Sequence, residues 1–189
     1  MILIFLLVSF VSSTIGAICG IGGGIIIKPV LDSLNILEVS KISLLSSCAV
    51  LSMSLYAFIQ SKISGNSKVD LKIATPLAVG GIFGGIAGKI LFSYIIVFFK
   101  SENIAGIFQS SILIFLTIIT LFFTIKNMGT NKIASLHITN IFLCLIIGII
   151  LGLLSSFLGI GGGPFNIMFL YFFFSMDEKI SAENSLYII

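Results

Sequence analysis

Long apolar stretches alternate with short polar ones along the whole chain. Residues 1–27 contain no charged side chain, and residues 136–176 contain none apart from any charge on His137. Such stretches are close to, or longer than, the roughly 20 apolar residues that cross a lipid bilayer as a helix. The pattern therefore predicts an all-α, polytopic membrane protein, a bundle of transmembrane helices.

Polar residues divide the chain into long and short apolar segments. We expect long segments at about residues 2–20, 39–59, 71–99, 104–125 and 138–158, and short ones at 25–37 and 164–175. Residues 176–189 look like the opening of a further helix that is cut off. The first segment lacks basic N-terminal residues and a cleavage site, so we interpret it as a membrane segment and not as a signal peptide.

Lysines gather in two of the polar loops. The loop at 60–72 holds Lys62, Lys68 and Lys72, and the loop at 126–137 holds Lys126 and Lys132. Short cytoplasmic loops of membrane proteins are enriched in lysine and arginine. Both loops are therefore predicted to face the cytoplasm, and the two segments between them cross the membrane out and back.

Composition narrows the class of protein further. Of the 189 residues, 58% are hydrophobic and 9% are charged, and the mean hydropathy is +1.25. Soluble domains carry about 25% charged residues, so a water-soluble enzyme, a nucleic-acid-binding module and a disordered protein are excluded. The three cysteines are widely spaced within apolar runs, so neither a disulfide framework nor a metal site is predicted.

The third of the long segments contains a stripe of glycines. Gly80, Gly84 and Gly88 are spaced four residues apart, and Gly81 and Gly85 form the neighbouring row. Small residues at this spacing let two membrane helices approach each other closely. We interpret the stripe as a helix-packing face, and a glycine-lined substrate passage is the alternative.

Two copies of one motif lie far apart in the chain. The sequence Gly-Ile-Gly-Gly-Gly at 20–24 recurs at 159–163, an offset of 139 residues, and Lys-Ile-Ser at 41–43 recurs at 179–181, an offset of 138. The two matches occur in the same order, each between a long and a short apolar run. They predict an internal repeat.

The repeat suggests how the chain is organised. Residues 1–130 are expected to form the first repeat, with four to five membrane segments and a loop at 60–70. Residues 138–189 are expected to form an incomplete second repeat.

Each set of adjacent glycines is expected to break a helix at membrane depth, since glycine destabilises a helix by about 1 kcal/mol relative to alanine. The short run after each break then begins as a half-helix whose free N–H groups and positive dipole end face the break. Two such ends make a site for an anion. The alternative is that the glycines are only hinges or points of close packing.

Neutral donors would hold a small oxyanion at such a site. The pairs Ser46-Ser47 and Asn184-Ser185 occupy matching places after the two motifs, so we prefer them to other serines. The candidate substrate-binding residues are Gly22, Gly23, Gly24, Gly161, Gly162 and Gly163 through their backbone, and Asn166, Ser46, Ser47, Asn184, Ser185 and Lys28 through their side chains.

Lys28 is the one cation close to a glycine motif. Its ammonium could attract an anion or could snorkel to the membrane surface. Pairing with Asp32, one helical turn further along, would make both residues structural. The lone His137 is interpreted as a residue of the membrane interface.

The course of the short run at 25–37 decides how the two halves are related. If it crosses the membrane by itself, the halves are inverted and the N-terminus is outside. If it only completes the first helix, the halves are parallel and the N-terminus is inside. The first segment alone is long enough to cross, so we favour inversion.

The sequences at 20–31, 152–166 and 182–186 resemble the TauE/SafE family of sulfite and organosulfonate exporters, and the resemblance extends over essentially the whole chain. It implies a multi-pass transporter, built from two related halves, that moves small sulfur-containing anions across the plasma membrane. The second half stops well short of the first, so we expect a chain truncated at its C-terminus, either a fragment or a natural truncation.

Together these features favour a secondary transporter that exports or imports sulfite or sulfonates by alternating access, without a cofactor. The alternative is a non-transporting membrane subunit that packs through its glycine faces. An enzyme is not expected, because the apolar segments hold no paired carboxylates, no His/Cys cluster and no G-x-S-x-G element. The expected partners are the lipid bilayer and a small anion and not nucleic acid; a homodimer is compatible with these features.

Overall fold

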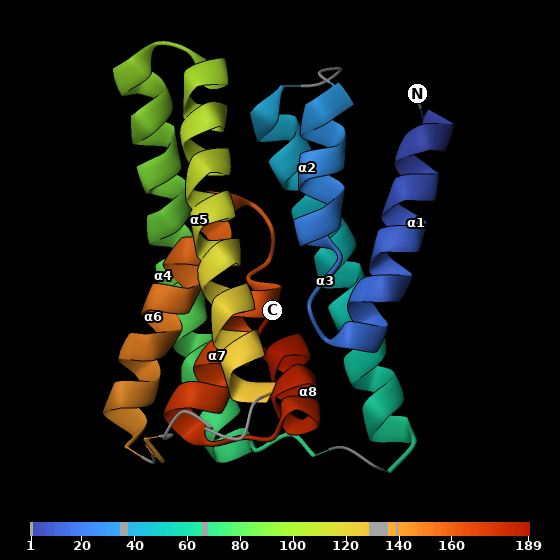
Figure 1. Ribbon diagram of the computed structural model, residues 1–189, viewed down its shortest axis with the longest axis vertical. Helices are drawn as coiled ribbons and strands as arrows, with labels where there is room; N and C mark the ends of the chain where they lie inside the picture. The colour runs from blue at the N-terminus through green and yellow to red at the C-terminus, as the bar shows by residue number, and fades with distance from the viewer. Residues whose placement is uncertain (1, 35–37, 66–67, 129–135, 139) are drawn as a thin grey trace.

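The computed structural model describes residues 2–34, 38–65, 68–128, 136–138 and 140–189, and within these ranges the regular structure is entirely α-helical. The helices are α1 (Ile2–Cys19), α2 (Gly24–Leu34), α3 (Val39–Ile63), α4 (Leu71–Phe99), α5 (Glu102–Met128), α6 (Ile141–Leu158), α7 (Gly163–Phe174) and α8 (Glu178–Ile188). They run roughly parallel to one long axis (Figure 1). The predicted all-α bundle is confirmed.

Four of the described helices, α3, α4, α5 and α6, are long and apolar enough to cross a membrane. Many of their large apolar side chains are exposed on the outside of the bundle, among them Ile82, Phe83 and Phe115. An apolar outer surface is what a bilayer requires of the protein it surrounds. The chain is therefore a multi-pass membrane protein.

Polar residues set the starts of two of these helices. The side chain of Asp70 accepts a hydrogen bond from the N–H of Lys72 (3.1 Å) at the start of α4, which therefore begins where the segment at 71–99 was expected. Asn140 accepts one from the N–H of Phe142 (3.0 Å), so α6 begins after this cap and not at residue 138. Caps of this kind satisfy N–H groups that have no partner inside the helix.

The two glycine motifs are the turns of two helical hairpins. Figure 1 shows that α2 runs back along α1, and that α7 runs back from the end of α6. Backbone hydrogen bonds from Leu136 to Phe172 (3.0 Å) and from Ile138 to Phe173 (2.9 Å) join the segment before α6 to the end of α7, as a hairpin requires. The short runs therefore do not extend the helices that precede them.

The hairpins enter the bundle from opposite ends, and their turns meet near its middle (Figure 1). Helices α1 and α6, which carry the two copies of the motif, accordingly run in opposite directions. This arrangement is the inverted one of the two that the sequence left open. Whether the two halves are homologous repeats is a separate matter and stays a prediction here.

The two lysine-bearing loops lie at one end of the bundle. Helix α3 ends and α4 begins at the same end at which α5 ends and α6 begins (Figure 1). Lys132, one of the lysines counted above, lies outside the described residues. The common side of the two loops agrees with the expected topology, and their cytoplasmic location stays a prediction.

The glycine stripe of α4 packs against α6. A Cβ atom added at Gly84 would collide with the backbone of Ile149, and one added at Gly148 would collide with the backbone of Leu77. Gly80, Gly88 and Gly152 show the same pattern. The helix-packing interpretation is confirmed for this row of glycines.

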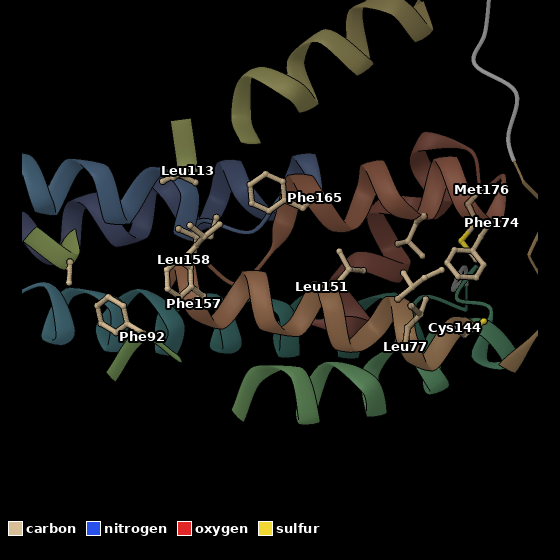
Figure 2. Packing of buried hydrophobic residues seen from close by; sticks show 14 residues of the cluster. Leu77, Phe92, Leu113, Cys144, Leu151, Phe157, Leu158, Phe165, Phe174 and Met176 are labelled. Atoms are coloured by element: carbon tan, nitrogen blue, oxygen red, sulfur yellow. The ribbon is translucent and has the colours of Figure 1, made fainter. Parts of the chain in front are cut away.

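A core of buried apolar side chains joins α6 to its neighbours (Figure 2). Near the end of α6, Phe157 packs edge-on against Phe92 of α4, with ring centroids 6.2 Å apart. Near its start, Cys144 lies close to Phe174 and Met176 (Figure 2). Helix α6 is thus held along its whole length, so the glycine turn that follows it has a fixed starting point.

Candidate functional site

Both glycine motifs break the helix where the sequence predicted. The first break, residues 20–23, follows the end of α1, and the second break, residues 159–162, follows the end of α6. Gly22 and Gly161 have φ angles of 75° and 74°, in the left-handed region that side chains disfavour. The two turns share this left-handed position, which favours glycine in both, but the second turn has a further one at Gly162 (φ 76°) that its counterpart Gly23 lacks.

The two breaks touch each other. A Cβ atom added at Gly24 would collide with the carbonyl group of Ile160, and one added at Gly163 would collide with the carbonyl group of Ile21. Only residues without side chains allow the turns to approach this closely. Close packing, the alternative to a binding role, thus accounts for Gly24 and Gly163.

The contacts around the breaks are reciprocal. Gly20 lies against Ala182, and Gly159 lies against Ser43. Gly159 is 139 residues after Gly20, and Ser43 is 139 residues before Ala182, so the two contacts are equivalent under one offset. The same holds for Gly22 against Ile189 and Gly161 against Val50. One offset of 139, the offset between the two glycine motifs, describes both pairs of contacts.

A cavity of about 270 Å³ lies beside the second break. We call it the Asn166 cavity; its walls come from α3, α4, α6, the second break, the start of α7 and the end of the chain. The lining residues are Ser47, Val50, Leu51, Ala78, Gly81, Ile82, Gly85, Leu151, Gly152, Ser155, Ser156, Gly161, Asn166, Ile188 and Ile189. None of the side chains in this lining is charged.

Asn166 lies in the first turn of α7 and is 2% exposed. Its Oδ1 atom is buried without a hydrogen-bond partner. The N–H groups of Phe165 and Asn166 bond to the carbonyl of Gly162 at 3.0 and 3.1 Å, while helix geometry leaves those of Gly162 and Gly163 without a partner inside the helix. The Asn166 side chain and the N-terminus of α7 therefore lie beside this cavity. The unpartnered Oδ1 is an acceptor and requires a donor such as water, while the Nδ2 group is the one that can donate to an anion.

The serine hydroxyls around the cavity are not equivalent. The Ser47 hydroxyl donates to the carbonyl of Ser43 (2.8 Å), and the Ser155 hydroxyl donates to the carbonyl of Leu151 (2.7 Å). Each hydroxyl proton is therefore bonded within the helix of its own serine and is not available to a ligand. The remaining side-chain donors of the lining are the Ser156 hydroxyl and the Asn166 amide. The cavity thus offers a few neutral donors in an otherwise apolar wall.

Three of the predicted binding residues line this cavity: Ser47, Gly161 and Asn166. Gly162 in the second break and Gly163 at the start of α7 do not line it. Gly22 and Gly23 lie in the first break, and Gly24 is the first residue of α2. Ser46 and Ser185 are fully buried elsewhere, each with an unpartnered hydroxyl. Asn184 donates to Ile180 (2.8 Å) and accepts from the N–H of Asp70 (3.1 Å), so it connects α8 to the start of α4.

Lys28 lies away from the lining of the Asn166 cavity and is only 1% exposed. Its ammonium donates to Gln109 Oε1, to the carbonyl of Leu158 (2.7 Å) and to the hydroxyl of Ser43 (3.2 Å). A buried ammonium with these partners does not snorkel, so that alternative is wrong.

Lys28 and Asp32 do not form an ion pair. In the ranges that the structure describes, the one ion pair within 4 Å joins Lys41 to Glu38 (2.9 Å). The suggestion that Lys28 and Asp32 are structural because they pair with each other is therefore wrong as well.

Gln109 of α5 is a residue that sequence reasoning missed. It is 1% exposed, accepts from Lys28 and donates through Nε2 to the carbonyl of Phe157. One signal was available, because Gln109 is an amide side chain inside the apolar segment at 104–125. Its partners were not predictable, since they come from other helices.

A second cavity, of about 360 Å³, lies beside the first break. We call it the threonine cavity, because Thr117, Thr120 and Thr124 of α5 line it together with Cys19 and Glu178. Each threonine hydroxyl donates to a carbonyl of α5 at 2.6 to 2.8 Å, and Glu178 carries the one charge in the lining. A carboxylate and hydroxyls with committed protons disfavour an anion, so the Asn166 cavity is the better candidate.

Comparison with known proteins gives one match. A family model described as Sulfite exporter TauE/SafE matches residues 5–189, which is nearly the whole chain. No curated protein and no solved structure matches the chain. The match to a family of exporters agrees with the long apolar helices described above. The chain therefore belongs to the TauE/SafE sulfite exporter family.

Proposed function

We propose that this protein is a secondary transporter that moves sulfite or small sulfonates across the plasma membrane, with the Asn166 cavity as its binding site. Membership in a family of membrane sulfite exporters supports the general class of substrate. The observation that carries the site is Asn166, a buried amide at the N-terminus of α7 that lines a cavity and can donate to an anion through Nδ2.

The chemistry of this cavity suits a small oxyanion that must be released again. The positive end of a helix dipole and free N–H groups attract an anion. Two neutral side-chain donors, Ser156 and Asn166, add hydrogen bonds. A lysine or arginine in the cavity would bind an anion more tightly, so a lining without charge favours reversible binding.

We also infer that the two halves are inverted repeats. The starts of α2 and α3 (Gly24, Val39) recur at α7 and α8 (Gly163, Glu178) with the offset of 139. The reciprocal contacts of the two breaks support the same relation. Residues 1–130 and 138–189 are then the two repeats, the second of them incomplete.

Inverted hairpins whose turns meet near the middle of the bundle suit alternating access. In transporters with inverted repeats, the substrate binds near the bilayer midplane at broken helices, and one repeat moves against the other. We expect the two repeats to move against each other at the glycine contacts between the two breaks. The direction of transport is then set by the ion or substrate gradient, and a homodimer is compatible with the mechanism.

No enzymatic activity is part of this proposal. A transporter family and a lipid-facing bundle favour substrate movement without covalent change. The expected partners are the bilayer and the anion, with no role for nucleic acid or a cofactor.

The test is transport by the purified chain reconstituted in liposomes. We expect uptake of radiolabelled methanesulfonate and sulfite above that of empty liposomes, and loss of at least about tenfold in rate for Asn166→Leu, because one or two hydrogen bonds to a charged ligand contribute about 1.5–3 kcal/mol each. Asn103→Leu, the same change at an exposed position of α5, serves as the control and should leave the rate unchanged.

The outcomes separate the two parts of the proposal. Absence of flux for every anion tested would contradict transport and favour the alternative of a non-transporting subunit. Flux that Asn166→Leu leaves unchanged would contradict the site while leaving transport intact.

A further inference from the structure

Two helix ends of opposite polarity meet at the second break. The C-terminus of α6 lies at Leu158 and the N-terminus of α7 at Gly163. Helix ends carry partial charges of about −0.5 and +0.5. Because the ends are so close, the negative end of α6 would cancel much of the attraction that α7 has for an anion.

Lys28 lies at the negative end. Its ammonium has three N–H groups, and three oxygen atoms surround it: Gln109 Oε1, the carbonyl of Leu158 and the hydroxyl of Ser43. Three acceptors match a protonated lysine, which has three donors and no acceptor. The cation is therefore bonded to the last carbonyl of α6.

Gln109 completes this arrangement. It accepts from Lys28 and donates to the carbonyl of Phe157, the residue before Leu158. Two carbonyls that have no partner inside α6 are thus satisfied by side chains of α2 and α5. Asp32, the nearest acid along α2, lies a full turn further from the break than Lys28.

The first break has no such cation. With the offset of 139, the position that corresponds to Lys28 is Ile167. Among the described residues, only the second break has a lysine bonded to its negative helix end. The first break adjoins the threonine cavity, where Glu178 supplies a negative charge.

We propose that Lys28 is a positioning residue for anion binding: it neutralises the C-terminus of α6, so that the N-terminus of α7 and Asn166 present a net positive potential to the Asn166 cavity. The inference rests on the proposed function and assigns the second break, not the first, as the anion site. Lys28 acts through the helix end and does not touch the substrate.

The distances make this effect large enough to measure. Lys28 Nζ lies 3.4 Å from the place that a Cβ atom would take on Gly159. Gly161, which lines the cavity, is two residues further along, at most about 8 Å from Gly159. At separations of about 10 Å and an effective dielectric constant of about 20, removing one charge weakens anion binding about tenfold.

The first experiment is Lys28→Met, with methanesulfonate and the neutral isostere dimethyl sulfone compared in proteoliposomes. We expect KM for methanesulfonate to rise about tenfold, while the concentration of dimethyl sulfone that inhibits by half changes less than twofold. A purely structural role for Lys28 would weaken both ligands together, and that result would overturn the proposal.

The second experiment is Gln109→Glu, which keeps Lys28 in place and adds a carboxylate beside it. The ion pair keeps the ammonium in place but cancels its charge, so KM for methanesulfonate should again rise about tenfold while inhibition by dimethyl sulfone changes less than twofold. Glutamate cannot donate to the carbonyl of Phe157, so some thermal stability is lost, and the comparison of the two ligands separates this loss from the effect of charge. Lys41→Met, which removes an exposed lysine of the same charge, is the control and should leave KM unchanged. Comparison of Gln109→Glu with Lys41→Met tests the role of the Lys28 charge even if Lys28→Met does not fold.

Failure of this inference differs from failure of the proposed function. Wild-type flux with an unchanged KM in Gln109→Glu would overturn the role of Lys28 alone. A wild-type protein that neither transports methanesulfonate nor is stabilised by it in a thermal shift measurement would overturn both.

Discussion

At the residue scale, the buried polar side chains fall into two groups. Lys28 and Gln109 have hydrogen-bond partners, whereas Asn166, Ser46 and Ser185 each keep an atom without one. An unsatisfied buried polar group costs about 1–3 kcal/mol. The first group therefore holds the helices in place. Asn166 is the member of the second group that also lines a cavity, where its Nδ2 group can donate to a ligand.

A glycine substitution separates backbone strain from crowding at this scale. Gly161→Ala forces a side chain into a left-handed conformation, at about 1–2 kcal/mol, and places it against Val50, at about 1–3 kcal/mol more. Gly65→Ala has a similar φ of 67° but nothing within 4 Å of the added atom. In detergent, we expect thermal unfolding to show a clearly larger loss of stability for Gly161→Ala. Equal losses would mean that the turn has room for a side chain.

At the scale of the element, α4 and α6 form the tightest pair of helices in the described part of the chain. Glycines on both helices face the backbone of the other one. Hydrocarbon provides no hydrophobic force between helices, so close van der Waals contact must hold them together. The second glycine row of α4 faces the Asn166 cavity, because Gly81 and Gly85 are among its lining residues. One helix thus supplies a packing face and a wall of the site.

Neighbouring glycines of α4 give a matched test of this packing. Gly84→Ala would push α4 away from Ile149, and we expect the free energy of unfolding to fall by about 1–3 kcal/mol. Gly85→Ala meets only a side-chain atom of Ser156 at 4.0 Å, and its better helix propensity should leave stability equal or up to about 1 kcal/mol higher. Thermal unfolding in one detergent compares the two. A similar loss for both variants would contradict the assigned packing face.

At the scale of the whole molecule, two hairpins enter from opposite ends and their turns meet near the middle of the bundle (Figure 1). The lysine-bearing loops share one end, and the connection from α4 to α5 lies at the other. This topology requires an N-terminus on the side opposite to the lysine-bearing loops. With those loops in the cytoplasm, the N-terminus lies outside.

Cysteine labelling tests this topology in cells. Starting from a variant in which Cys19, Cys48 and Cys144 are alanine, single cysteines are introduced as Ser64→Cys, Leu136→Cys and Lys100→Cys. A membrane-impermeant maleimide should label the cysteine at Lys100 from outside and reach the other two only after the cells are permeabilised, since lysine-rich loops stay in the cytoplasm. Labelling of Ser64→Cys and Leu136→Cys on opposite sides would contradict the fold, and a full reversal would contradict only the orientation.

The sequence by itself determined the class of the protein and the places where its helices break. Apolar length and scarce charge indicate membrane helices whatever their arrangement, because the bilayer requires both. Adjacent glycines at 22–24 and 161–163 interrupt a helix through local backbone preference. Asn166 was also predictable, since it follows the second motif within one helical turn.

Tertiary structure alone decided which polar groups meet. The sequence left Lys28 divided between anion attraction and snorkelling, and its partners come from α3, α5 and the end of α6. It paired Ser46-Ser47 with Asn184-Ser185, but only Ser47 lines the cavity, while Asn184 connects α8 to α4. The physical reason is that helix breaks follow from local backbone energetics, whereas the partner of a buried polar group depends on how distant helices pack.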